Sequence, residues 1–412
     1  MNIKKYTALI LLINILLLSS CARETKRAET NSKILQDHVL ILDPAPNEKD
    51  IFWETRISFA AAGDNIIHEA VFTDAKNSAA VYASNTGKQV RYRFADMFGG
   101  IADIIKEADI AYINHETPVA GDSFGIKGYP DFNAPSEVGD DLAEVGFDII
   151  NIANNHMLDM GEAGLRNSIS YWKEKAEEKS LKIIGGYTKA DYDNVRYIEK
   201  DGVKIALLSY TTFINDKHKN SLSSNSELKI PYANEADMTR QVGLAKEGGA
   251  DLVIVSMHWG VENQFQPNAA QKRYASHLAS LGVDVILGSH SHTLQPIEWI
   301  DGKDGHRTLC AYSLGNCLST MLYSYYMVGG ILTFDIVMND VGETVIENPI
   351  LIPMMCHYSM TRDSLKLYTL ENYTDALVSS HGAQLNGAFT MRTLHGYVTD
   401  TIDSEFLPEY FK

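Results

Sequence analysis

Short apolar runs alternate with longer amphipathic stretches along most of the chain, beginning near residue 56. The apolar runs that predict strands are 57–62, 110–113, 149–153, 205–210, 252–257 and 283–287. Stretches with a helical pattern occupy 94–108, 136–145, 235–247 and 268–281. Nearly continuous apolar strands between helices are typical of α/β folds, in which helices cover the faces of the sheets. We therefore expect an α/β fold.

The pattern changes in the last part of the chain. Residues 215–227 are rich in Lys, Asn and Ser and predict a surface loop. After about Thr320, strand-like runs at 330–334 and 346–352 give way to a less regular tail rich in Tyr, Thr and Asp. The predicted division is a main domain at 51–352 and a C-terminal extension packed on it at 353–412.

The N-terminus has the pattern of an export signal. Lys4 and Lys5 precede an apolar run at 8–18, which is shorter than the roughly 20 residues needed to span a bilayer. Small residues directly before Cys21 resemble a lipobox, so we expect Cys21 to carry a lipid; the alternative is an ordinary signal that contains a cysteine. We predict a lipoprotein signal at 1–21 and a flexible tether at 22–50, hence an exported, membrane-anchored protein at the cell surface or facing the periplasm.

Charge and cysteine content narrow the function classes. Asp and Glu outnumber Lys and Arg by 53 to 36, giving a formal charge of −17 and arguing against a nucleic-acid partner. A polyanionic substrate fits such a chain only if metal ions or a local basic patch offset the field. The remaining cysteines, Cys310, Cys317 and Cys356, are odd in number, so we expect buried thiols rather than a disulfide framework.

Metal-binding residue types follow five of the predicted strands. They are Asp64 after the first, Asn114 and Glu116 after the second, Asn154, Asn155, His156 and Asp159 after the third, and His258, His290 and His292 after the last two. In α/β folds, ligands and metals bind at the carboxyl ends of strands. Two neighbouring divalent ions need a bridging carboxylate with imidazole, carboxylate and amide ligands. The sequence therefore predicts two divalent metal ions, with Mn, Fe, Zn and Co left open.

Individual roles follow from position. His290 and His292 are two residues apart, so on an extended segment both rings face the same way. His156, on a turn beside Asn155, is the predicted general acid, with Asp159 as its partner. The predicted metal ligands are Asp64, His68, Glu116, Asn155, His258, His290 and His292, and the predicted substrate contacts are Asn114, Asn154, Trp259 and Glu262.

Several of these positions also fit a purely structural role. His68 is either a ligand, a substrate contact or a surface residue, and Trp259 is either a substrate contact or a buried structural residue. Without a role in the site, Asp64 would be a helix N-cap, Glu116 a turn residue, Asn154 a turn cap and Asp159 a helix cap.

A series of short motifs carries a family resemblance. The motifs are Gly63-Asp64, Asn114-x-Glu116, Ala153-Asn154-Asn155-His156-x-x-Asp159-x-Gly161, His258-Trp259-Gly260-x-Glu262, Gly288-x-His290-x-His292-x-x-Gln295-Pro296 and Tyr312-Ser313-Leu314-Gly315-Asn316. Their order over about 56–352 resembles the CapA-type capsule-synthesis (poly-γ-glutamate capsule accessory) family, which is related to calcineurin-like metallophosphoesterases. The resemblance implies a four-layer α-β-β-α sandwich of two mixed sheets. It also implies that Asp64, Glu116 and His292 bind one metal, and that Glu116, Asn155, His258 and His290 bind the other.

The chain departs from this resemblance at a few positions. The phosphoesterase Asp-x-His of the first strand is absent, and Glu116 stands where an Asp usually bridges the metals. Ser291 and Cys317 replace a frequent Pro and a more usual aromatic, which we expect to affect packing.

The resemblance implies a phosphoesterase-like, metal-dependent hydrolase that supports synthesis of poly-γ-glutamate or another capsule polymer. Its partners would be an anionic polymer or a phosphorylated substrate, and a capsule-synthesis complex in the membrane. The competing hypothesis is a non-catalytic, metal-binding assembly or polymer-transport factor. A third hypothesis, a secreted nucleotidase, predicts a pair of aromatic rings near the site.

Overall fold

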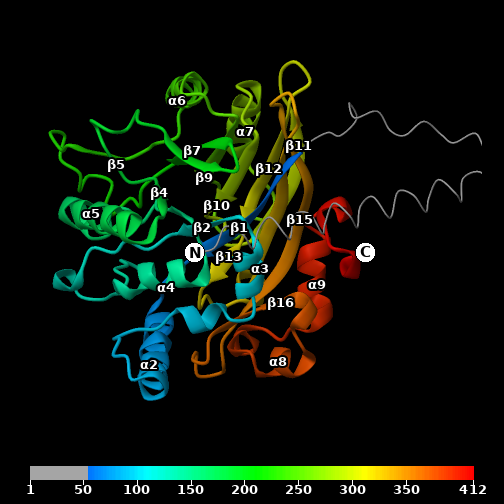
Figure 1. Cartoon of the computed structure of the whole chain (residues 1–412). Helices are drawn as coiled ribbons and strands as arrows, with labels where there is room; N and C mark the ends of the chain where they lie inside the picture. The colour runs from blue at the N-terminus through cyan, green and yellow to red at the C-terminus, as the bar shows by residue number, and fades with distance from the viewer. Residues whose placement is uncertain (1–53) are drawn as a thin grey trace, which may run out of the picture. The chain divides into compact units, whose positions relative to one another are not determined.

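Two mixed β-sheets form the centre of this computed structural model, which describes residues 54–412 (Figure 1). The predicted signal peptide, the lipid on Cys21 and the tether fall outside the described residues. Among the residues described, none of the helices has the length and apolar character needed to cross a membrane.

The first sheet has eight strands, and β1 lies near its middle. Its order is β16-β15-β14-β1-β2-β3-β4, and β13 also pairs with β1. The bounds are β1 (Thr55–Asn65), β2 (Ile110–His115), β3 (Ile149–Asn151), β4 (Lys182–Ile184), β13 (Asn316–Leu318), β14 (Val328–Met338), β15 (Thr344–His357) and β16 (Lys366–Thr369). Strands β1 to β4 are parallel to one another, whereas β14, β15 and β16 are joined by antiparallel pairing.

The second sheet has six strands in the order β11-β12-β10-β9-β7-β6. Its bounds are β6 (Arg196–Lys200), β7 (Val203–Thr211), β9 (Leu252–His258), β10 (Val285–Ser289), β11 (Leu294–Asp301) and β12 (Arg307–Leu314). The four central strands are parallel and the two edge strands antiparallel. Strands β5 (Tyr187–Thr188) and β8 (Leu228–Lys229) form a separate two-stranded sheet.

Helices cover the outer faces of the two sheets. Alternation along β7 shows the layering: Ile205 and Leu207 enter the core shared with the first sheet, and Ala206 and Leu208 pack with α6 (Glu235–Glu247) and α7 (Ala269–Ser280). The first sheet packs against α3 (Ala102–Glu107), α4 (Glu137–Val145) and α5 (Gly161–Lys179). Helix α2 (Glu69–Thr86) contributes to the same core and is drawn below α4 in Figure 1. The four-layer arrangement of two mixed sheets is confirmed.

Most predicted elements are present, and the differences are local. The stretch at 94–108 forms a 3₁₀ turn at Ala95–Phe98 followed by the short helix α3, instead of one helix. Strand β15 runs through residue 352, where the main domain was predicted to end, and the chain then adds β16, α8 (Asp375–Ser380) and α9 (Met391–Thr399). The division into a domain and an extension stays a prediction.

Strand pairing aligns the polar strand ends. In the first sheet the register places Asp64 opposite Asn114, and Asn114 opposite Asn151. In the second sheet Thr211 and Ser289 both pair with His258. The end of β1 lies very close to the β12–β13 turn, because a Cβ on Gly63 would come within 2.0 Å of Gly315 O. Only glycine permits this approach.

Candidate metal centre

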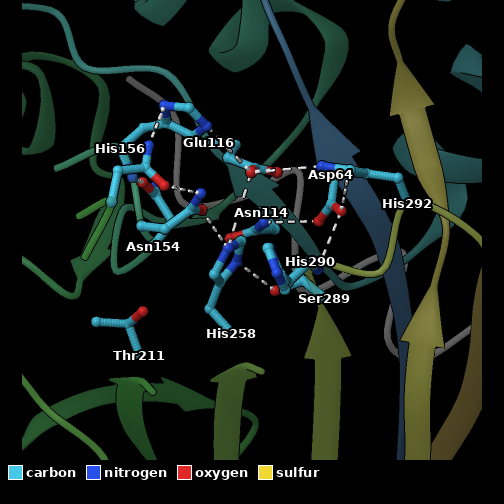
Figure 2. A network of polar contacts seen from close by, with 12 residues as sticks. Asp64, Asn114, Glu116, Asn154, His156, Thr211, His258, Ser289, His290 and His292 are labelled. Carbon is cyan, nitrogen blue, oxygen red and sulfur yellow. Dashed lines mark hydrogen bonds and ion pairs between the residues drawn. The ribbon is translucent and has the colours of Figure 1, made fainter. Parts of the chain in front are cut away.

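Side chains from both sheets converge on the carboxylate of Glu116 (Figure 2). Three imidazoles direct Nε2 at its Oε1: His258 at 3.7 Å, His292 at 3.8 Å and His156 at 3.9 Å. These distances are too long for hydrogen bonds. Both Glu116 oxygens are buried and have no partner among the described residues. The carboxylate is thus surrounded by nitrogen ligands without being bonded to any of them.

Two groups of possible ligand atoms share Glu116. Glu116, His290 and His292 form one, and Asp64, Glu116 and His258 form the other, with all ligand atoms of a group within 4.8 Å of one another. We call these five side chains the metal-ligand cluster. The shared Glu116 fits the predicted bridge, although Asp64 and His290 fall in different groups from those implied by the resemblance.

The backbone at the two neighbouring histidines is not extended, and that prediction was wrong. His290 has φ +96° and His292 has φ +57°, in the left-handed region that non-glycine residues rarely adopt. The two rings nevertheless lie near each other, with centroids 5.8 Å apart. His290 Nδ1 is buried without a partner in the part of the chain that is described. Such strain costs of order 1–3 kcal/mol per residue and concentrates at functional sites.

Burial opposes charge at Glu116 and at the three histidines of the cluster. It raises the pKa of Glu116 well above its ordinary value and lowers the pKa of His258 and of His290 well below theirs. Burial also lowers the pKa of His292, but Glu116 and Asp64 outweigh it and raise this pKa to about 9. A divalent cation would neutralise the negative charge of the two carboxylates, and the nitrogen and oxygen atoms without hydrogen-bond partners would coordinate it. The residues present therefore fit bound metal, and the mixed donor set suits Mn, Fe, Zn or Co.

A buried chain of amides fixes the orientation of Asp64. Asn114 Nδ2 donates to Asp64 Oδ1 at 2.7 Å, and Asn151 Nδ2 donates to Asn114 Oδ1 at 2.7 Å. Asn151 Oδ1 in turn accepts from Ser209 Oγ, which belongs to the second sheet, at 2.5 Å. Asn114, predicted to contact substrate, is 1% exposed and orients Asp64. Sequence reasoning missed Asn151 and Ser209, although Asn151 ends a strand as the other site residues do.

A second set of contacts positions Asn155 and His258. Asn155 Oδ1 lies 2.7 Å from His258 Nε2, and His258 Nδ1 lies 3.0 Å from Ser289 Oγ. The Asn155 amide also donates to Asn215 Oδ1 at 2.8 Å, and Asn215 N donates to Asn155 O at 3.1 Å. Asn215 lies in the segment predicted as a surface loop, and for that reason the sequence did not reveal it.

His156 is held by a carboxylate on its far side. Its Nδ1 lies 2.7 Å from Asp159 Oδ2, which also accepts from Phe132 N at 2.8 Å. The Phe132 ring meets the His156 ring edge-on, with centroids 4.8 Å apart. Because Asp159 accepts the Nδ1 proton, Nε2 is free to face Glu116. Asp159 thus has the predicted hydrogen bond to His156.

Three other predicted residues have structural partners. Asn154 Oδ1 accepts from His156 N at 2.9 Å and so caps the turn. Trp259 has no exposed surface and donates its indole N–H to Tyr312 O, as expected of a buried structural residue. His68 lies outside both ligand groups, and its Nδ1 accepts from Thr320 N at 3.3 Å. Glu262 is exposed near the cluster, where its charge raises the pKa of Glu116 after the larger effects of burial and Asp64.

The thiols also follow the sequence prediction. Cys310, Cys317 and Cys356 are buried and free. Burial raises the pKa of each of them, so they remain uncharged.

Several known proteins are similar to this chain. Capsule biosynthesis protein CapA of Bacillus anthracis is 31% identical over 237 residues, covering 55% of this chain and 54% of that protein. PGA biosynthesis protein CapA of Bacillus subtilis (strain 168) is 30% identical over 238 residues, covering 56% of this chain and 57% of that protein. The chain thus spans about half the length of these relatives. Calcineurin-like phosphoesterase YfkN from Bacillus subtilis superposes with TM-score 0.40 and 16% identity over 72% of this chain and 91% of that one, a likeness too low to bear on activity.

The family model described as bacterial capsule synthesis protein PGA_cap matches residues 58–321. This range includes every member of the metal-ligand cluster, together with His156, Asp159 and Asn155. The chain therefore belongs to the PGA_cap family of bacterial capsule synthesis proteins.

Proposed function

We propose that this protein is a metal-dependent, phosphoesterase-like hydrolase that supports synthesis of an extracellular polymer, either poly-γ-glutamate or another capsule. The observation that carries the proposal is the buried Glu116 carboxylate, which has no bonded partner among the described residues yet lies among the imidazoles of His156, His258 and His292. A buried charge without a partner is costly, and a metal site is a common reason for a protein to keep one.

Two divalent cations would be held by Asp64, Glu116, His258, His290 and His292, with the Asn155 amide oxygen as a further ligand. When bound, they would supply Lewis-acid polarisation of a phosphoryl or carbonyl oxygen. Asn114 and Asn151 fix the carboxylate of Asp64, while Asn215 and Ser289 fix Asn155 and His258. Such outer partners orient the ligands before metal arrives.

His156 is the residue placed to move a proton. Asp159 accepts from Nδ1 and orients the ring so that Nε2 faces the cluster; with both nitrogens protonated, Nε2–H can donate a proton to the leaving group and Nδ1–H stays bonded to Asp159. His156 is 8% exposed, so the residue is largely buried and a small part of its surface reaches solvent.

The proposal is tested by hydrolysis assays on the full chain loaded with Mn²⁺ or Zn²⁺. The substrates are p-nitrophenyl phosphate, bis(p-nitrophenyl) phosphate and oligo-γ-glutamate. His156→Ala should retain metal and lose activity by about 10²–10⁴-fold, the usual contribution of a general acid. His277→Ala is the control and should stay active, because His277 is half-buried between α7 and α6 and lies outside the cluster. A metal-loaded chain that hydrolyses none of these substrates would favour the non-catalytic assembly or transport factor.

An aromatic group near the cluster favours a second candidate, hydrolysis of a nucleotide. Tyr323 and Tyr325 stack with ring centroids 5.5 Å apart, and the Tyr326 ring lies 6.5 Å from that of His292. Stacking on such rings would bind a nucleobase. This candidate predicts faster hydrolysis of adenosine 5′-monophosphate than of ribose 5-phosphate, with the difference lost in Tyr323→Ala.

We also propose export and anchoring in the membrane through a lipid on Cys21, with a capsule-synthesis complex as partner. The support is the sequence pattern at 1–21 and membership of the family. Metabolic labelling with a clickable fatty acid tests the anchor, because the label should be lost in Cys21→Ser.

A further inference from the structure

A cavity of about 480 Å³ lies beside the metal-ligand cluster, and His68 forms part of its wall. The wall also includes the first turn of α2, Tyr129 and the turn at 361–363. Packed aromatic rings link the wall of this cavity to the cluster, because the His68 ring meets Phe132 at 5.4 Å and Phe132 meets His156 at 4.8 Å. A ligand in this space would therefore lie two ring contacts from His156.

Arg362 contributes a guanidinium to the wall of this cavity. Its Nη2 donates to the carbonyl oxygen of Thr320 and, at 3.1 Å, to Thr320 Oγ1. Thr320 N donates in turn to His68 Nδ1 at 3.3 Å, so one residue links Arg362 to His68. Within residues 54–412, Arg362 Nε and Nη1 have no hydrogen-bond partner, and no carboxylate lies within 4.0 Å of the guanidinium.

Two of the three carboxylates in the wall already have partners. Asp74 accepts from Ser364 N at 3.0 Å and from Leu365 N at 2.8 Å. Asp363 accepts from the hydroxyl of Ser359 and, at 2.9 Å, from that of Thr361. Both carboxylates therefore hold the turn that carries Arg362, and neither neutralises the guanidinium. Arg362 is exposed, so the donors that no protein group uses are open to solvent or to a ligand.

We propose that Arg362 binds an oxyanion of the substrate, a carboxylate or a phosphate, which lies beside the group that reacts. A guanidinium with two free donors matches the two oxygens of such a group. The inference rests on the proposed function, because the cavity serves a substrate only if the neighbouring cluster is the reaction site. Arg362 lies beyond residues 58–321, so the C-terminal part of the chain would contribute to substrate choice.

The test is calorimetric titration of the full chain with tetra-γ-glutamate and, separately, with inorganic phosphate. Arg362→Gln should weaken binding by roughly tenfold or more, the usual effect of losing a charge-assisted pair. Arg362→Lys keeps the positive charge but lacks the planar guanidinium group, so its affinity for each ligand should lie between those of the parent and Arg362→Gln. Arg392→Gln, an exposed arginine on α9, is the matched control and should bind like the parent. The tighter ligand identifies the oxyanion as carboxylate or phosphate.

Repeating the titration after treatment with EDTA separates this inference from the proposed function. If the chain binds no metal but Arg362→Gln still weakens ligand binding, the subsite stands and the metal-dependent reaction falls. Equal affinity of Arg362→Gln and the parent for both ligands would overturn the inference, as would failure of the parent to bind either. Thermal melting and metal content of each variant should match the parent, which shows that the fold and the cluster are intact.

Discussion

Replacing Glu116 by Gln should have opposite effects on stability with and without metal. The substitution keeps the shape of the side chain and removes its charge. In the absence of metal, both Glu116 oxygens are buried and unpartnered among the described residues, and burial raises the pKa of this carboxyl well above its ordinary value of 4.5. The neutral amide should therefore stabilise the metal-free fold, whereas the metal-loaded fold should lose a ligand.

The size of the effect follows from the protonation equilibrium. A carboxyl whose folded pKa is raised destabilises the protein progressively as pH rises from its unfolded pKa toward its folded one. Protonating Glu116 costs about 1.4 kcal/mol for each pH unit above 4.5, or about 3.4 kcal/mol at pH 7. This cost is the largest destabilisation that Glu116→Gln can relieve at pH 7. We expect a gain of about 1–3 kcal/mol, equivalent to a melting temperature raised by roughly 1–4 °C for a chain of this size.

Differential scanning calorimetry of the parent and Glu116→Gln, in EDTA and in excess Mn²⁺, measures both effects. In EDTA the variant should melt higher at pH 7 and level with the parent near pH 4.5. In Mn²⁺ the parent should gain about 2.7 kcal/mol for each bound ion at a hundredfold excess over its Kd, and the variant less. Asp74→Asn is the matched control, because this buried carboxylate has two backbone donors and its loss should destabilise the protein in both buffers. A variant that melts below the parent in EDTA would refute the reasoning.

Three other substitutions have defined outcomes. Asn215→Ala should weaken metal affinity or activity by roughly 10–100-fold in a metal titration, because it frees the amide of Asn155 while leaving the fold intact. Asn151→Leu should cost about 1–3 kcal/mol in urea unfolding, since the buried groups that it bonds to lose their partner. Burial lowers the pKa of His381 to about 4, so stability should fall by about 3 kcal/mol as pH drops from 6.5 to 4, a slope that His381→Asn should flatten.

The fold was largely predictable because buried parallel strands leave a strong signal in sequence. Runs such as 252–257 contain few polar residues, and the strand that they form, β9, lies at the centre of the second sheet. The tail after residue 352 was less predictable, since its short helices α8 and α9 begin at local caps and α9 packs against β14. Periodicity cannot show such long-range packing.

The candidate site was predictable where residues end strands, and less so where loops return to it. Asp64, Glu116 and His258 follow directly from the strand pattern, because the register aligns strand ends within each sheet. Asn215 and Arg362 come from segments without periodic pattern, and their proximity to the site depends on how the chain folds back over the sheets. The left-handed backbone of His290 likewise has no counterpart in the sequence pattern.

The most direct test of the central claim is the metal content of the full chain, measured by inductively coupled plasma mass spectrometry beside His290→Ala. The account predicts two equivalents of divalent metal per chain in the parent and a clear loss in the variant. No tightly bound metal in the parent, even after it is supplied with Mn²⁺ and Zn²⁺, would contradict the account.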